Sequence, residues 1–118
     1  MAGEDYGRRE KHVNEVISGV AKEVMLSIFG RRGLESIIKV MKGKYGLDLD
    51  DIPEKPHTFS EALREIIGIG SVIIEDLIIE NLYIKVGLEL RLRKNYNFPD
   101  YINEVKNHIS LNQGKVSE

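Results

Sequence analysis

The chain has 118 residues, of which 42% are hydrophobic and 31% charged, a composition typical of one folded domain over residues 1–118. It contains no cysteine, which excludes disulfide bonds, thiolate metal sites and a cysteine nucleophile. The net charge of −2 gives no overall basic excess of the kind that favours nucleic acid or anionic membranes.

The N-terminal part of the chain predicts a long amphipathic helix. Residues 1–7 form a loose, polar start without the apolar region of a signal peptide, so we expect the protein in the cytoplasm. From Val13 to Phe29 the apolar residues recur every three or four positions, which is the period of a helix face. Gly19 either weakens this helix or permits close packing, and Gly30 ends it.

A second helix is expected over residues 33–45, with its apolar residues on one face. Gly46 followed by Leu47 is typical of a left-handed C-cap with a hydrophobic contact. The connection that follows is bounded by Pro53 and Pro56, whose rings lack an amide donor and disfavour helix in the preceding residues.

The next helix is predicted to begin at a capping box, because Thr58 and Glu61 stand three residues apart and each side chain reaches the other's backbone amide. We expect this helix to extend to about Ile67. The glycines of residues 68–70 then break or kink the chain, and Ser71 is a natural N-cap for the helix that follows.

The most apolar stretch is Ser71–Val86, where apolar triplets alternate with polar pairs. Around a helix these triplets reach nearly every side, so this central helix must be covered almost all round, by its own chain or by a second copy. The stretch has sixteen residues and four charges, which argues against a membrane span, and we expect no membrane association.

After Gly87 the apolar residues alternate with polar ones, as in a strand, so residues 88–93 form either a short extended segment or more helix. Pro99 stands early in a last helix with an apolar face from Tyr101 to Ile109, and residues 111–118 are expected to be loose. The predicted fold class is mainly all-α, a compact bundle of four to five helices around the central helix.

Candidate catalytic and ligand-binding patterns are weak throughout the sequence. The glycines at 68–70 follow a predicted helix and lack a P-loop lysine, so a structural break is favoured over anion binding. The acids of residues 48–54 lack EF-hand spacing, and Glu104 with His108 supplies two metal ligands without a second pair. We therefore expect no catalytic residue, no cofactor and no metal, and a protein that is not an enzyme.

Two groups of basic residues are candidate phosphate contacts. One lies along the second helix, and the other precedes the last helix. If folding brings them together they suit a DNA-binding transcriptional regulator, whereas solubilising surface charge is the alternative interpretation. The candidates are Arg31, Arg32, Lys39, Lys42, Arg91 and Arg93.

Three stretches between Leu34 and Tyr101 carry a recognisable pattern of caps and core positions: YGLDLDDIPEKP, FSEALREIIGIG and IIEDLIIENLYIKVGLE. The pattern covers more than half of the chain and resembles the archaeal family "Nitrosopumilus output domain 5" (NitrOD5). The resemblance implies an archaeal protein with an output or interaction role in signalling or regulation, and it carries no catalytic residue over. A single Gln, no Cys and abundant Ile, Glu and Lys also fit a thermophile.

We predict a non-enzymatic regulatory or protein-interaction module that associates with itself, as a dimer, through the central helix. The candidate interface residues are Ile74, Ile78, Ile79 and Leu82. The long first helix is the other candidate interface. A protein partner and DNA are the further candidate partners, and a small-molecule sensor would need a pocket beside the central helix.

Overall fold

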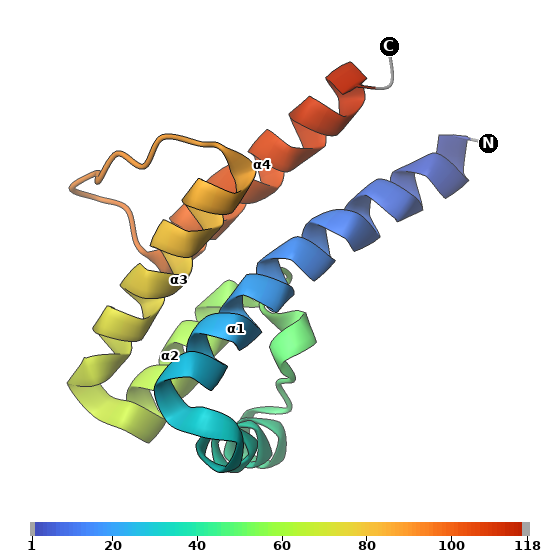
Figure 1. The fold of residues 1–118 in the computed structure, drawn as a ribbon. Helices are drawn as coiled ribbons and strands as arrows, with labels where there is room; N and C mark the ends of the chain where they lie inside the picture. The colour runs from blue at the N-terminus through green and yellow to red at the C-terminus, as the bar shows by residue number, and fades with distance from the viewer. Residues whose placement is uncertain (1, 117–118) are drawn as a thin grey trace.

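In the computed structural model, every regular element of the described residues is a helix (Figure 1). The structure describes the backbone of residues 2–116 and the side chains of residues 10–111. Four α-helices and two short 3-10 helices follow one another: α1 (Ala2–Tyr45), η1 (Leu49–Asp51), α2 (Pro56–Ile67), η2 (Gly68–Gly70), α3 (Ser71–Val86) and α4 (Phe98–Val116). The predicted all-α bundle is confirmed.

The helices α1, α3 and α4 pack against one another, and α2 packs against all three. Helix α1 runs away from the end of the molecule where both termini lie, whereas α3 and α4 run back toward that end (Figure 1). Apolar side chains from all four helices and from the loop after α1 fill the space between them. The largest fully buried ones are Ile17, Met25, Met41, Leu47, Leu49, Ile52, Phe59, Leu63, Ile78, Leu82, Tyr83 and Ile102.

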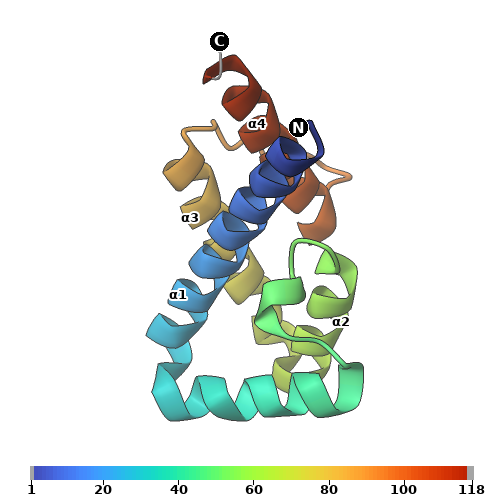
Figure 2. The ribbon, with the colours of Figure 1, turned by 90° about the vertical axis from the view of Figure 1, so that its right-hand side faces the viewer.

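Gly30 divides α1 into two arms that point in different directions (Figure 2). Its backbone has φ 72° and ψ 175°, a region that essentially only glycine adopts, inside an otherwise helical run. The predicted end of the first helix at Gly30 is therefore confirmed as a break, after which the helix resumes at once. The second arm of α1 (residues 31–45) lies across one end of the molecule.

We expect Gly30→Ala to lower the free energy of unfolding by about 1–2 kcal/mol, because a Cβ atom disfavours the left-handed half of the φ range. Gly19→Ala is the matched control on the same helix, since an added Cβ there meets nothing within 4 Å. It should raise stability by up to about 1 kcal/mol. Urea denaturation followed by circular dichroism measures both, and equal stability of the two variants would contradict the assigned kink.

Both left-handed glycine caps end their helices. Gly46 has φ 61°, and the amide of the buried Leu47 donates back to the Met41 carbonyl at 3.2 Å, which confirms the predicted cap. Gly87 has φ 72° and ends α3, with the Leu88 amide donating to the Tyr83 carbonyl at 2.9 Å. These two caps direct the chain back over the core at each end.

The connection from residue 88 to residue 97 has no regular secondary structure, so residues 88–93 form neither a strand nor more helix. The described residues contain no strand with which this segment could pair. Leu88 and Leu90 pack against the core while Leu92 is 84% exposed. The alternation in the sequence therefore reflects packing of one side of an irregular segment on the helices.

The starts of α2 and α3 differ from the predicted ones. Helix α2 begins at Pro56 without a side-chain cap, because proline suits the first helical position and needs no acceptor for an amide. The capping box is instead formed by Asp48 and Asp51 around η1. Ser71 is not an N-cap: it lies in the first turn of α3, and its buried hydroxyl has no hydrogen-bond partner among the described residues.

Helices also extend into both predicted loose ends. Residues 2–7 form the first turns of α1, which begins at Ala2, and residues 111–116 form the last turns of α4, which ends at Val116. Residue 1 and residues 117–118 lie outside the described residues. Within the described chain, no helix combines the length and the apolar character needed to cross a membrane.

Candidate interaction surface

The four interface residues expected from the sequence lie in the core of a single chain. Ile78 and Leu82 are fully buried, and Ile74 and Ile79 are nearly so. They occupy the side of α3 that packs against the other helices of the same chain, so a second copy cannot reach them in this fold. Any self-association through α3 must use its other side.

The side of α3 opposite the core carries a row of residues that we call the outer stripe: Ile73, Leu77, Glu80 and Ile84. Their spacings of four, three and four residues place them on one face, as in the seam of a coiled coil. Ile73 is 65% exposed and Ile84 80% exposed, while Leu77 is half-buried. Helix α3 is therefore covered on one side only, and the prediction that it is covered almost all round does not hold within one chain.

The outer stripe borders a hollow between α1 and α3, which lie side by side and antiparallel (Figure 1). This α1–α3 groove has a volume of about 400 Å³. Its apolar lining is Val20, Val24 and Ile28 from α1 and Leu77 and Ile84 from α3. Glu23 and Lys85 stand on its two edges, so the same surface presents an acid and a base.

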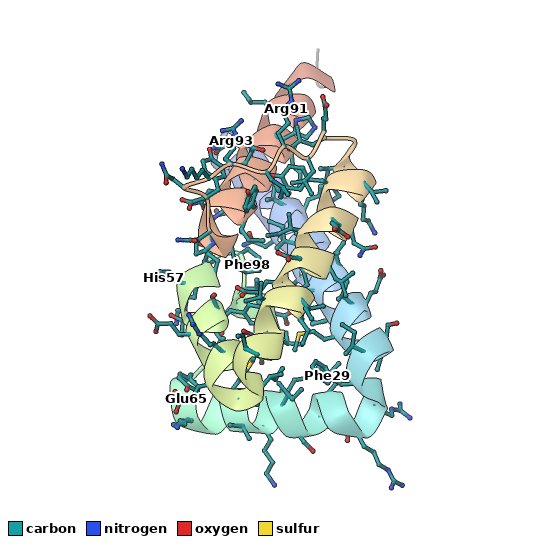
Figure 3. All side chains as sticks on the ribbon, turned by 90° about the vertical axis from the view of Figure 1, so that its left-hand side faces the viewer. Phe29, His57, Glu65, Arg91, Arg93 and Phe98 are labelled. Atoms are coloured by element: carbon teal, nitrogen blue, oxygen red, sulfur yellow. The ribbon has the colours of Figure 1, made fainter. Side chains whose placement is uncertain are left out.

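The two basic groups lie at opposite ends of the molecule and form no common track. Arg91 and Arg93 lie toward the end reached by α4, whereas the second arm of α1 crosses the other end (Figure 3). Arg91 pairs with Glu89 at 3.3 Å, and Arg93 pairs with Glu104 at 3.4 Å and donates to the Tyr96 hydroxyl at 2.7 Å. The condition for a joint phosphate site is not met.

The second arm of α1 keeps a basic outer face of its own. Its four candidate residues Arg31, Arg32, Lys39 and Lys42 are all exposed, and Lys42 lies 4.0 Å from Asp48. The next cation, Lys44, pairs with Glu65 of α2, which also accepts a hydrogen bond from Tyr45. This pairing lowers the pKa of Glu65 and attaches the end of α1 to α2.

The acids of residues 48–54 have partners within the chain. Asp48 and Asp51 cap η1, Asp50 accepts from Lys22 at 2.6 Å, and Glu54 accepts from Asn14 at 3.1 Å. They attach this loop to α1. No group of three His, Cys, Asp or Glu side chains among the described residues is arranged to hold a metal ion.

Glu104 and His108, the two candidate metal ligands of the last helix, each contact a different group of α3. Glu104 accepts from the Tyr83 hydroxyl at 2.7 Å, and the His108 ring lies 3.2 Å from the Val86 carbonyl oxygen. Both side chains of α4 therefore contact α3.

A second hollow, between α2 and α3, was not anticipated from the sequence. This α2–α3 hollow has a volume of about 430 Å³ and includes residues of the turn before α4. Helix α2 contributes His57, Ser60, Glu61 and Arg64, and α3 contributes Val72, Glu75, Asp76 and Ile79. Both sets follow the spacing i, i+3, i+4, i+7 of one helix face. This spacing can be read from the sequence, but it does not distinguish a binding site from ordinary helix packing.

Comparisons of the chain with protein-family models, with curated proteins and with solved structures find no match.

Proposed function

We propose that the protein is a non-enzymatic interaction module of regulatory type whose copies associate in pairs through the outer stripe and the α1–α3 groove. The observation that carries the proposal is the exposure of Ile73 and Ile84 on the outer stripe, together with the α1–α3 groove that Ile84 lines. Exposed apolar side chains that share one helix face are characteristic of protein interfaces. The resemblance to the NitrOD5 output domains motivates the regulatory role.

A second copy is the occupant that the surface favours. The groove is bordered by both an acid and a base, Glu23 and Lys85, so the surface has complementary charges for a copy of itself. A two-fold interface uses the same patch on both partners, and the apolar residues of the outer stripe, Ile73, Leu77 and Ile84, can then pack beside α3 of the second copy. Two bundles joined in this way cover the side of α3 that one chain leaves exposed.

We expect the wild-type protein to sediment at twice its chain mass of 13.4 kDa and Ile84→Glu to sediment as a single chain. A buried, unpaired carboxylate in the interface opposes association, whereas in the separated chain position 84 faces solvent and tolerates it. Leu92→Glu is the matched control, because Leu92 is equally exposed but lies in the connection after α3. It should remain paired.

Circular dichroism distinguishes dissociation from unfolding, since Ile84→Glu should keep the wild-type helix content. A wild-type protein that stays a single chain at every concentration reached would overturn the proposal. Dissociation by Leu92→Glu to the same extent would show that the effect is not specific to the outer stripe.

The alternative function is nucleic-acid binding, now confined to the basic outer face of the second arm of α1. Four phosphate contacts from Arg31, Arg32, Lys39 and Lys42 imply a slope of about −3 to −4 in log affinity against log salt on duplex DNA. Sedimentation with labelled duplex DNA at low and physiological salt tests this. Binding that is absent, or that survives the change of Arg31 and Arg32 to Glu, discards it.

A further inference from the structure

The α2–α3 hollow lies on a different side of α3 from the outer stripe, and none of the outer-stripe residues lines it. Figure 3 looks onto this side, with His57 at the start of α2 and Phe98 at the start of α4. The hollow lies between two helix faces and is bordered by residues 96–97 and by the start of α4. Its volume, about 430 Å³, is that of a small-molecule site.

The charges that line the hollow favour a cation. Three carboxylates, Glu61, Glu75 and Asp76, face it together with one guanidinium, Arg64. The acids come from both helices, so a positive group bound between α2 and α3 interacts with carboxylates on either side. An anion would meet a single arginine against three carboxylates.

Glu75 is the acid whose position needs the most explanation. It stands one helical turn from Ser71 and from Ile79, both buried, so it lies on the core-facing side of α3 rather than on the outer stripe. The Ser60 hydroxyl donates to its Oε2 atom at 2.6 Å and is the one hydrogen-bond donor to this carboxylate among the described side chains. A half-buried carboxylate with one donor has room for another at Oε1.

The electrostatics of Glu75 agree with this geometry. Loss of solvent raises the pKa of Glu75, and the neighbouring Asp76 raises it further, whereas the Ser60 hydrogen bond and Arg64 lower it. A cation beside Glu75 would offset both the lost solvation and the repulsion from Asp76. Perturbed carboxylates in a hollow are a recognised property of binding sites.

The border of the hollow supplies the apolar and aromatic contacts that an organic cation requires. Val72 is half-exposed at the edge, and Tyr96 is half-buried in the bordering turn. The Tyr96 ring already lies 4.8 Å from the Arg93 guanidinium, in a cation–π contact. An alkyl chain can therefore lie against Val72 while its charged end lies between the carboxylates.

We propose that the α2–α3 hollow binds a small organic cation carrying an ammonium or guanidinium group, with Glu75 and Asp76 as the carboxylates that receive it. Glu75 accepts a hydrogen bond from the cation at the oxygen that Ser60 does not use. Asp76 adds charge at the mouth of the hollow, where it is exposed. Such a ligand would lie directly beside α3.

Isothermal titration calorimetry with agmatine, an alkyl chain that carries both a guanidinium and an ammonium group, tests the assignment. Glu75→Gln should weaken agmatine binding about tenfold or more, which is the effect of removing a hydrogen bond to a charged group. Glu80→Gln is the matched control, because it makes the same charge change on the outer stripe of the same helix. Its affinity should stay within about twofold of wild type.

Three results would overturn the proposal: no saturable binding of agmatine by the wild-type chain, an equal loss of affinity in Glu80→Gln, or preferential binding of the dianion glutarate. If Glu75→Gln fails to fold, amide chemical shifts of the wild-type chain decide instead. Agmatine should then shift the resonances of Ser60, Arg64 and Glu75 and leave Ile73 and Ile84 unchanged. Shifts confined to the outer stripe would contradict the site.

Discussion

Replacing Ile78 with alanine is expected to lower the free energy of unfolding by about 3–4 kcal/mol. Ile78 is 0% exposed and lies on the core-facing side of α3, so the change removes buried methyl and methylene groups and leaves a cavity between tightly packed helices. Because a small domain is stable by about 5–15 kcal/mol in total, the loss is a large part of its stability. Urea denaturation measures it as a lower midpoint.

Ile73→Ala is the control for this measurement. The same substitution on the same helix, five residues earlier, removes a side chain that is 65% exposed, so the free energy of unfolding of the single chain should change by less than about 1 kcal/mol. Both variants must be measured at a concentration where the chain is unpaired, since association also stabilises the fold. Similar losses for the two variants would mean that α3 is covered on both sides.

The comparison of Ile73 with Ile78 shows what the sequence could not reveal. Both are isoleucines in the same apolar stretch, which forms one helix as predicted, α3, with Ser71 in its first turn rather than as its N-cap. The apolar triplets reach nearly every side of the helix, so the sequence carries no signal for the side that the bundle covers. That choice depends on where α1 and α4 pack, which is a property of the whole fold.

The basic groups illustrate the same limit at longer range. The break at Gly30 was predicted from the sequence, but the direction of the second arm was not. Because that arm crosses the end of the molecule remote from Arg91 and Arg93, folding does not bring the two clusters together (Figure 3). A glycine with φ 72° permits the turn, and packing of Leu34, Ile37 and Met41 on the core fixes its direction.

The α2–α3 hollow could not be predicted because its parts are distant in the sequence. The face of α2 that begins at His57 and the face of α3 that ends at Ile79 are bordered by residues 96–97 and the start of α4. In the sequence, Glu75 stands out only as half of the polar pair Glu75-Asp76, and its place one turn from the buried Ser71 and Ile79 comes from the structure. Buried acids are rare without a partner, so such a position indicates either a structural pair or a ligand.

Helix α3 therefore presents three different environments around its circumference. The core side holds Ile78, the outer stripe carries the proposed contact between copies, and Glu75 faces the proposed cation site from the edge next to α2. A ligand between α2 and α3 and a second copy on the outer stripe would contact the same rigid helix from two directions. Whether the two events are coupled is measurable as a change of agmatine affinity between wild type and Ile84→Glu.

We expect Glu104→Ala to lower the free energy of unfolding by about 2–3 kcal/mol, the value of hydrogen bonds that involve a charged group in a partly buried site. Glu104 accepts from the Tyr83 hydroxyl at 2.7 Å and pairs with Arg93 at 3.4 Å, so it links α3, α4 and the connection between them. The rings of Tyr83 and Tyr101 pack edge to face beside it, with centroids 6.3 Å apart. Asn103→Ala, at the neighbouring exposed position, should change stability by less than about 0.5 kcal/mol.

The same hydrogen bond predicts a response to alkaline pH. Burial, together with the Glu104 carboxylate, raises the pKa of Tyr83 above its usual range, so the native chain keeps the phenolic proton at a pH where the unfolded chain has lost it. The unfolded state then binds fewer protons than the native state, and the free energy of unfolding falls as the pH rises above about 10. Tyr83→Phe removes this titration, so its free energy of unfolding should fall less steeply with alkaline pH than that of wild type. At neutral pH the variant should be less stable than wild type. If the free energy of unfolding of Tyr83→Phe falls with alkaline pH as steeply as that of wild type, another tyrosine is responsible for the loss. Tyr45 is then the first to replace, because its hydrogen bond to Glu65 also raises its pKa.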